Sequence, residues 1–219
     1  MKQIIDLTHC IEEEMTLCPL SWHTRVSIKQ IGHHEIEGRA TQKLIMGSHT
    51  GTHTDAPRHF ITNGACIEDI PLDQLIGEVS IFNFSYLQEY EAITEEMLSG
   101  KELKPKVLFN LGWFRKWKTK DFYTGYPYFS ESAAQYLIRN KVRLIAMDTP
   151  SPDDSRIKIG GPDDSKIHKL FLSNKIVLVE YLANLDKIDE KYDWNIIVMP
   201  LKIKNGDGAP SRVCVYRDD

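Results

Sequence analysis

The residues of this chain that could do chemistry are concentrated in one stretch, Ser48 to Phe60, which reads SHTGTHTDAPRHF. Three of the eight histidines and one aspartate lie within it. Imidazole nitrogens and carboxylate oxygens are donors that zinc, manganese and iron accept. The candidate ligands and bases are His49, His53, Asp55 and His59. So many donors so close together favour a metal site over a loop whose polar side chains merely bond one another.

The backbone of this stretch is predicted to be a loop or an irregular extended segment. Gly51, the β-branched threonines and Pro57 all work against helical geometry. His49 and His53 are therefore not expected to be a helical pair like the H-E-x-x-H pair of metalloproteases. Glycine permits a tight bend, and proline stiffens the exit toward His59, so that the side chains can surround one point.

Two residues far along the chain are further candidates. Strand alternation places Glu180 on the same face as Leu178, and a buried carboxylate costs several kcal/mol unless it is paired or bound to a metal. The alternative is that Glu180 ends its strand and reaches solvent. His168 precedes it on a short predicted helix, and a histidine in such a place is by itself more often structural. Together the two side chains could converge on one point.

Length and composition bound the class of protein. The chain has 219 residues, of which 42% are hydrophobic, so a single domain over residues 1–219 is expected. The net charge of −4 is not accompanied by a basic stripe, which argues against a nucleic-acid partner. No apolar run reaches about 18 residues, so no membrane span is expected.

Two features of the sequence bear on the location of the protein, the N-terminus and the cysteines. The first residues contain no apolar run of signal-peptide length, so a cytoplasmic protein is expected. The four cysteines form no C-x-x-C pair and are interpreted as reduced thiols.

Short apolar and alternating runs predict more strands than helices. Strands are expected at residues 2–7, 24–31, 39–46, 78–84, 106–111, 142–147, 175–182, 194–203 and 212–216. Ser130 is expected to cap a helix that ends near Asn140, and Ser165 to cap the helix that contains His168. The pattern indicates an α/β or α+β fold with a mixed sheet curled toward a barrel and short flanking helices, and the strand-to-helix links favour α/β.

Residues 113–128 are crowded with aromatic side chains. They could pack down on the core or form one wall of a substrate pocket, and the sequence does not choose between these roles. Trp113 is the candidate substrate contact from this run.

The run H-T-G-T-H-T-D-A-P-R-H resembles the H-x-G-T-H-x-D-x-P-x-H signature of the metal-dependent cyclase family, which includes bacterial kynurenine formamidases and isatin hydrolases. Other patches resemble the family in matching order along nearly the whole chain: residues 5–8, 146–151 and 200–210. The resemblance implies the family's swivelling β/β/α fold and a homo-oligomer, a dimer or a tetramer.

The resemblance also implies roles for individual residues. His49, His53 and Asp55 match the ligands of a first metal, and Asp55, His168 and Glu180 match those of a second. The ions implied are Zn²⁺ or Mn²⁺, one or two per chain. His59 matches the general acid/base.

This chain departs from the family near the expected pocket. Cys18 stands at the place of a substrate-contacting tryptophan, and Asn110 begins an N-L-G-W run where many members have R-T-G-W. Both changes bear on the identity of the substrate and leave the metal ligands intact.

The function expected is a metal-dependent hydrolase of a C–N bond in a small amide, an aryl formamide or a lactam. A metal-bound hydroxide would attack the carbonyl, and His59 would act as general acid/base. One alternative is a lactone hydrolase, a cyclase or a dehydratase that uses the same metal site. Another is a protein that binds a metal or ligand without catalysis.

Overall fold

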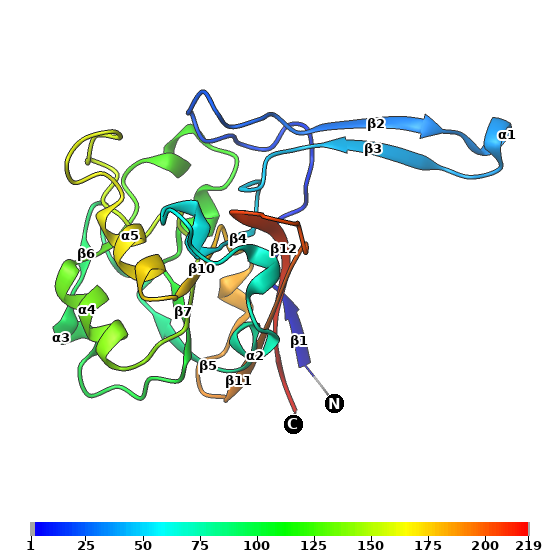
Figure 1. The fold of residues 1–219 in the computed structure, drawn as a ribbon. Helices are drawn as coiled ribbons and strands as arrows, with labels where there is room; N and C mark the ends of the chain where they lie inside the picture. Colours follow the sequence, from blue (N-terminus) through cyan, green and yellow to red (C-terminus); the bar gives the residue numbers. More distant parts are fainter. Residues whose placement is uncertain (1–2, 219) are drawn as a thin grey trace.

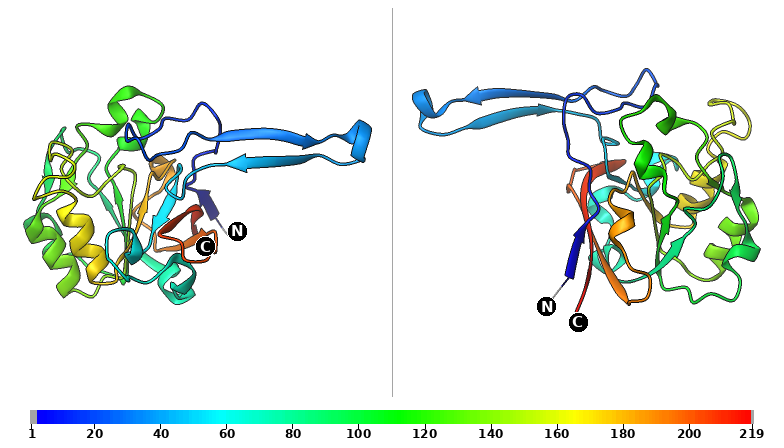
Figure 2. Two further views of the ribbon diagram at one scale, coloured as in Figure 1. Left: turned by 45° about the horizontal axis from the view of Figure 1, so that its top comes forward. Right: turned by 180° about the vertical axis from the view of Figure 1, so that it is seen from behind.

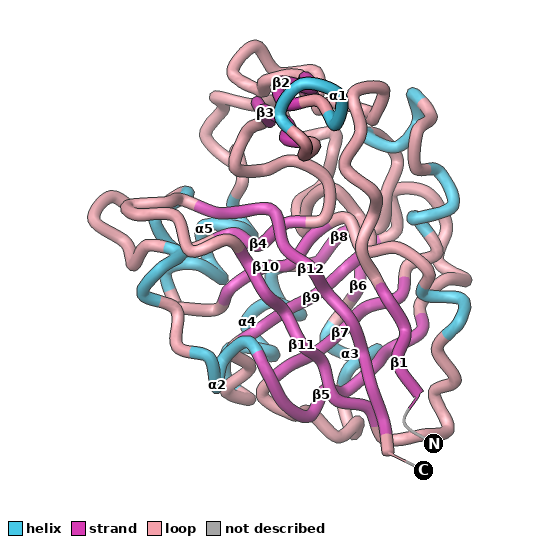
Figure 3. The backbone as a smooth tube through the Cα atoms, turned by 90° about the vertical axis from the view of Figure 1, so that its right-hand side faces the viewer, coloured by secondary structure: helices cyan, strands magenta, loops and turns pink. Residues whose placement is uncertain are grey.

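Seven strands close into a barrel in this computed structural model, which describes residues 3–218. The order around the ring is β12-β11-β5-β7-β9-β10-β4, and β4 pairs back with β12 to close it. The added strand β1 (Gln3–Asp6) lies beside the other end of β12, as Figure 3 shows. The ring strands are β4 (His53–Asp55), β5 (Ile76–Asn83), β7 (Lys106–Asn110), β9 (Leu144–Met147), β10 (Val177–Glu180), β11 (Trp194–Pro200) and β12 (Gly208–Arg217).

The four central strands are parallel and are apolar on both faces. The strands β5, β7, β9 and β10 pair in parallel, which requires crossover connections. One face packs on helices, where Phe109 meets Phe129 and Phe171 lies among the same buried residues. The other face points into the barrel, where Leu108 and Val179 pack with Trp194. Burial on both sides explains why these strands are nearly continuous apolar runs.

Short helices and turns connect the strands. Figure 1 shows α4 and α5 side by side on the outer face of the parallel strands. The helices that follow β4 in the chain are α2 (Leu72–Leu75), α3 (Glu95–Leu98), α4 (Glu131–Arg139) and α5 (Lys166–Ser173). The 3-10 turns are η1 (Pro57–His59), η2 (Ile67–Asp69), η3 (Trp113–Lys116), η4 (Lys120–Tyr123) and η5 (Leu185–Lys187). The strands β6 (Ala92–Ile93) and β8 (Tyr128–Phe129) form a separate two-stranded parallel sheet. Among residues 3–218, no helix is long and apolar enough to cross a membrane.

A hairpin extends far from the barrel. It consists of β2 (Ser27–Gly32), α1 (His34–Glu37) at the tip and β3 (Thr41–Ile45). The views of Figure 2 agree that it projects into solvent. We call residues 25–45 the arm.

Two expectations about local structure need correction. The segment around His53, expected to be a loop or an irregular extended segment, contains β4, because its backbone pairs with β10 on one side and β12 on the other. Ser165 occupies the N-cap position of α5, but its side chain makes no capping hydrogen bond. Its backbone is left-handed, with φ of 52°, and another residue supplies the cap.

A buried carboxylate ties the end of β9 to the chain after β7. Asp148 is fully buried and accepts hydrogen bonds from the backbone N–H groups of Leu111, at 2.9 Å, and Phe114, at 3.0 Å. Burial raises the pKa of Asp148 to about 6, although these N–H groups favour the ionised form.

The titration of Asp148 should be visible in the stability of the fold. Between pH 4 and 6 the folded chain holds a proton on Asp148 that the unfolded chain has lost, because the pKa is raised from 3.8 to about 6. This contribution to the free energy of unfolding therefore falls as pH rises through that window. Asp148→Asn cannot titrate there.

Urea denaturation of the wild type and Asp148→Asn at pH 4.5 and pH 7 tests this. Between pH 4.5 and pH 7, the free energy of unfolding of the variant should increase by roughly 2 kcal/mol relative to that of the wild type. Other titrations are common to both proteins and cancel. An equal difference at both pH values would contradict the raised pKa.

Candidate active site

The pairing register of β4 brings two candidate ligands beside a third. Glu180 on β10 lies directly opposite His53, and Leu178 lies opposite Asp55. Opposite residues of an antiparallel pair project from the same face, so Glu180 and His53 face the same space. Glu180 is buried rather than exposed at the end of its strand.

The loop before β4 delivers His49 to the same place. Gly51 has φ of 60°, a conformation in which glycine is favoured, and the chain reverses there. On the far side, Gly208 of β12 lies opposite Asp55. A Cβ at Gly208 would lie 2.8 Å from Cε1 of His49, so this position leaves room for the imidazole only because it is glycine.

His168 is placed by a cap at the start of α5. The carboxylate of Asp153 accepts hydrogen bonds from the backbone N–H groups of Ile167, at 2.6 Å, and His168, at 3.1 Å. Asp153 is therefore the cap that Ser165 was expected to provide. The same carboxylate lies 2.6 Å from Nδ1 of His168, and so it fixes the orientation of the imidazole as well.

Two carboxylates join the three imidazoles. Oδ1 of Asp55 lies 2.7 Å from Nδ1 of His49 and 3.3 Å from Nε2 of His53, while Oδ2 lies 3.7 Å from Nε2 of His168. Glu180 lies 3.5 Å from His53 and 3.1 Å from His168, through its two oxygens. Four of these five separations, from 3.1 to 3.7 Å, are those of neighbouring ligands of an ion with bonds of about 2.1 Å.

Each of these imidazoles has its second nitrogen held by an acceptor. Nδ1 of His53 lies 2.7 Å from the carbonyl oxygen of Gly51, and Nδ1 of His168 faces Asp153. Nε2 of His49 lies 2.9 Å from Asp207. An acceptor at one nitrogen leaves the other as a free ligand atom, which is the arrangement found around metal-binding histidines.

His59 lies at the edge of this cluster. It ends η1, its side chain is 29% exposed, and its ring centroid is 3.9 Å from that of His49. Nδ1 of His59 lies 3.5 Å from Asp207. His59 and His49 both belong to a group with Asp55 whose ligand atoms are close enough to hold one ion, while His53, Asp55 and Glu180 form a second such group. Asp55 is common to both.

The buried carboxylates of the cluster are stabilised by positive charge. In the described part of the chain, every ion pair of Asp55 and Glu180 is with a histidine. Burial would raise the pKa of Asp55, but the imidazoles of His49 and His59 hold that pKa well below its ordinary value. Burial and the neighbouring Asp55 raise the pKa of Glu180.

The pKa values of His49 and His168 shift in the opposite direction. Burial would lower the pKa of His49, but Asp55 and Asp207 raise it to about 10. Protons on His49 and His168 therefore balance the carboxylates. A divalent cation would supply the same charge with neutral imidazoles as ligands, so this donor set fits a metal ion.

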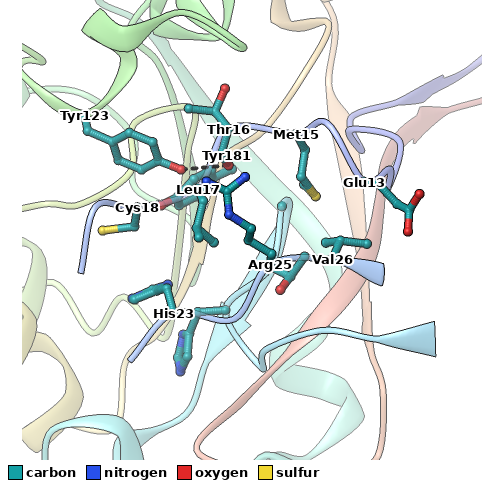
Figure 4. Close-up of a pocket in the computed structure, with 13 residues that line it drawn as sticks. Glu13, Met15, Thr16, Leu17, Cys18, His23, Arg25, Val26, Tyr123 and Tyr181 are labelled. Carbon is teal, nitrogen blue, oxygen red and sulfur yellow. Dashed lines mark hydrogen bonds between the residues drawn. The ribbon is translucent and has the colours of Figure 1, made fainter. Parts of the chain in front are cut away.

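The cluster opens onto a cavity of about 320 Å³, which is the size of a small-molecule site. Cys18 and Tyr126 line it, together with His23 and the exposed Trp22. Burial and Glu180 raise the pKa of the Cys18 thiol to about 11, so this cysteine is not a thiolate nucleophile at neutral pH. Figure 4 shows Cys18 near Tyr123, whose hydroxyl donates a hydrogen bond of 3.1 Å to the carbonyl oxygen of Thr16.

The aromatic run divides between core and cavity. Tyr123 and Tyr126 line the cavity, whereas Trp113 lies behind its wall and donates a hydrogen bond of 2.8 Å to the carbonyl oxygen of Phe122. Trp113 is only 5% exposed. The other departure from the family pattern, Asn110, is buried and accepts a hydrogen bond from the backbone of Gly112. Neither Trp113 nor Asn110 is among the residues that line the cavity.

The sequence matches the Cyclase family model over residues 5–154, which is more than half of its 219 residues. The chain belongs to the Cyclase family. This confirms the resemblance drawn from the histidine-rich motif.

Curated relatives in this family are kynurenine formamidases. That of Bacillus thuringiensis subsp. konkukian (strain 97-27) is 31% identical over 176 residues, which cover 79% of this chain and 78% of the relative. That of Geobacillus thermodenitrificans (strain NG80-2) is 27% identical over 221 residues, with 99% of each chain covered. The Cyclase-family chain described here is accordingly an enzyme.

Solved structures agree on the fold. Isatin hydrolase A from Labrenzia aggregata, bound to benzyl benzoate, superposes with a TM-score of 0.88 at 24% identity and covers 100% of this chain and 94% of its own. A potential metal-dependent hydrolase with cyclase activity matches with a TM-score of 0.73 at 26% identity, over 100% of both chains. The predicted α/β class, with a mixed sheet curled into a barrel, is confirmed.

Asp153 and Asp207 are the site residues that the sequence reasoning missed. Neither residue is among the candidates that donor type and spacing indicate. A signal did exist at Asp207, because it stands in a G-D-G run. A Cβ at Gly206 would lie 2.7 Å from Ile67, so both flanking glycines permit a close approach of the turn to the site.

Removal of Asp207 should weaken metal binding without unfolding the chain. Asp207→Ala leaves Nε2 of His49 without its acceptor, so we expect zinc affinity to fall about 10- to 100-fold. Asp207→Asn retains one acceptor oxygen, so its zinc affinity should lie between those of the alanine variant and the wild type. Competition with a chromogenic chelator measures the affinity. Asp186→Asn, at an exposed aspartate, is the control, and an unchanged affinity in Asp207→Ala would refute the role.

Proposed function

We propose that this protein is a metal-dependent hydrolase of a C–N bond in a small amide, an aryl formamide or a lactam. One observation carries the proposal. Two buried carboxylates and three imidazoles, each with its second nitrogen held, converge at the floor of an open cavity. Relatives named kynurenine formamidase and isatin hydrolase support the choice of an amide.

The proposed ligands are His49, His53, Asp55, His168 and Glu180, with Zn²⁺ or Mn²⁺, one or two ions per chain. When bound, such an ion lowers the pKa of water toward neutrality and polarises a carbonyl group. Solved relatives titled metal-dependent hydrolases support this assignment. The donors contain imidazole and carboxylate and no thiolate, which suits either ion.

His59 is proposed to move the proton in the reaction. Nδ1 of His59 lies 3.5 Å from the carboxylate of Asp207, which favours the tautomer that presents Nε2 as the acceptor of a proton from the attacking water. The same imidazole then returns the proton to the nitrogen that leaves the carbonyl. Partial exposure at the cavity edge allows this exchange, whereas His53 and His168 are buried and have both ring nitrogens held by oxygen atoms of the protein.

The cavity indicates the shape of the substrate. The aromatic rings of Phe60, Tyr123 and Tyr126 offer flat apolar walls, which suit an aryl group. Cys18 contributes a small neutral side chain at the position where the resemblance to the family implies a tryptophan, so this cavity would admit a bulkier ring system at that point. Trp113 can act only through Tyr126, against which its ring packs with centroids 6.2 Å apart.

Further parts of the proposal concern the whole molecule. It is a single Cyclase-family domain over residues 1–219, located in the cytoplasm, that acts on a small molecule and forms a homo-oligomer. The alternatives are a lactone hydrolase, or a cyclase or dehydratase that uses the same site. Turnover measured on a panel of N-formyl aryl amines, lactams and lactones would separate them by which compound reacts and which product forms.

His59→Ala should abolish hydrolysis while metal is retained. Loss of a general acid/base typically lowers turnover about 10²- to 10⁴-fold, whereas the ligands around Asp55 stay in place. The measurement is kcat on the best panel substrate, with the metal content of the same sample determined by elemental analysis. His33→Ala, on the arm, is the matched control. Wild-type turnover in His59→Ala would remove this residue from the mechanism.

Removal of the metal should abolish hydrolysis reversibly. Treatment with a chelator followed by dialysis should leave a folded, inactive chain, because the site residues alone do not activate water. Addition of Zn²⁺ or Mn²⁺ should restore turnover, and comparison of the two ions would identify the better one. Full activity in a sample shown by elemental analysis to be metal-free would refute metal dependence.

A further inference from the structure

The cavity above the proposed metal ligands changes from a buried floor to an exposed rim. Asp55 and Glu180 at the floor are 1% and 3% exposed. Three large apolar side chains that line the same cavity are much more exposed, and we call them the rim: Trp22 (67%), Ile157 (40%) and Ile159 (51%). Exposed apolar side chains that gather at the mouth of a pocket are typical of a ligand-binding surface. A substrate whose amide reaches the floor would meet the rim with its opposite end.

The rim is built from two segments that are distant in the sequence. Trp22 belongs to the segment before the arm, whereas Ile157 and Ile159 belong to the yellow loop before α5 in Figure 1. The aromatic rings of Phe60 and Tyr126 line the same cavity. Aromatic walls together with an apolar mouth suit a substrate whose aryl ring carries a further apolar group.

The lining of the cavity lacks the side chains that usually bind a carboxylate. Among residues 3–218, no lysine and no arginine lines it. Arg156 lies in the loop before α5, but it forms an ion pair of 2.6 Å with Asp154. The same guanidinium donates a hydrogen bond of 3.2 Å to the hydroxyl of Tyr128 and lies 5.1 Å from the ring centroid of Tyr90. These contacts hold Arg156 outside the lining.

A second arginine lies beyond reach of a substrate in the cavity. Arg25 lines a narrower neighbouring pocket, which Figure 4 shows and which shares Cys18 and His49 with the cavity. The narrow pocket has a volume of about 20 Å³, which is room for about one water molecule. A carboxylate group attached to an aryl ring is too large to pass through it to Arg25.

An ionised side chain of the lining also disfavours an anion. Asp164 accepts hydrogen bonds from the backbone N–H of Gly160, at 2.9 Å, and the hydroxyl of Ser165, at 2.8 Å. The N–H of Gly160 lowers the pKa of Asp164, so this carboxylate is charged at neutral pH. Lys169 donates its hydrogen bond to the backbone carbonyl oxygen of Asp164 rather than to the carboxylate. A carboxylate on the substrate would therefore meet a like charge.

We propose that the cavity selects an uncharged, elongated substrate: an aryl amide whose ring carries an apolar group that extends to the rim, and which bears no carboxylate. This inference rests on the proposed hydrolase function and narrows its substrate class. It also separates this chain from the relatives named for kynurenine, an amino acid whose carboxylate would find no lysine or arginine in this cavity.

Binding of three matched amines to the zinc-loaded wild type tests the proposal without turnover. The probes are 4-aminobiphenyl, aniline and 4-aminobenzoate, which are the amines that hydrolysis of the corresponding aryl formamides releases. Calorimetry at pH 8 keeps an imidazole of lowered pKa, such as that of His23, uncharged.

The affinities should follow the apolar surface and the charge of the probe. 4-Aminobiphenyl should bind about tenfold more tightly than aniline, because its second ring buries about 50 Å² of apolar surface at the rim. 4-Aminobenzoate should bind about fivefold more weakly than aniline, an amount typical of interactions between partly exposed charges. About 1 M NaCl should remove the penalty on 4-aminobenzoate and leave the preference for 4-aminobiphenyl.

Variants of the rim connect these ratios to named side chains. Ile157→Ser/Ile159→Ser should reduce the preference for 4-aminobiphenyl over aniline to about twofold or less, because the apolar contacts are lost. Ile159→Arg supplies a guanidinium, so the affinity for 4-aminobenzoate relative to aniline should rise about fivefold above that in the matched variant Ile159→Gln. The control is Leu72→Ser, at an apolar residue of α2 that is 60% exposed and does not line the cavity.

Binding of 4-aminobenzoate as tight as that of aniline in the wild type would overturn the proposal. A preference for 4-aminobiphenyl that persists in Ile157→Ser/Ile159→Ser, or no detectable binding of that amine, would overturn it as well. Failure of the proposed hydrolase is distinguishable from these outcomes. The expected order of amine affinities without turnover of any formamide would reject the hydrolase and retain the selectivity of the cavity, whereas turnover without that order would do the reverse.

Discussion

The structure depends on one buried negative charge, the carboxylate of Asp55. It lies on the strand that closes the barrel, so it cannot move to solvent without opening the fold. Its two oxygens face different imidazoles, those of His49 and His168, which lie 119 residues apart in the sequence. Burial of such a charge is favourable only when positive charge surrounds it, and the loop before β4, β4 itself and helix α5 bring the imidazoles of His49, His53 and His168 to it.

The sequence was sufficient for those parts of the site that local chemistry determines. The cluster of histidines around Asp55 stands out because donor types and spacing are visible without any fold. Glu180 could be recognised because a carboxylate within an apolar strand needs a partner. Short apolar runs likewise predicted the strands, although not their parallel pairing; Leu108 and Phe109 point to opposite faces of β7 and are both buried.

The remaining parts depend on contacts between distant segments, which no local pattern contains. Residues His53 to Asp55 form a strand only because β10 and β12 lie on either side, so propensity could not reveal it. Asp153 caps α5 from 14 residues away, and Asp207 lies 158 residues from the imidazole that it contacts. Trp113 has the composition of a pocket residue, but its indole N–H finds an acceptor inside the protein, and it packs inward.

The short length of β4 has a consequence for the amount of folded protein in a cell. Three residues make the closing strand, and two of them, His53 and Asp55, are proposed ligands of the same ion, so the bound ion would stabilise the closure of the barrel. An ion that binds only the folded chain adds free energy that grows with the logarithm of its concentration. Metal supply would then govern how much of this enzyme survives proteolysis, and starvation for the ion would deplete the protein itself, beyond silencing its chemistry.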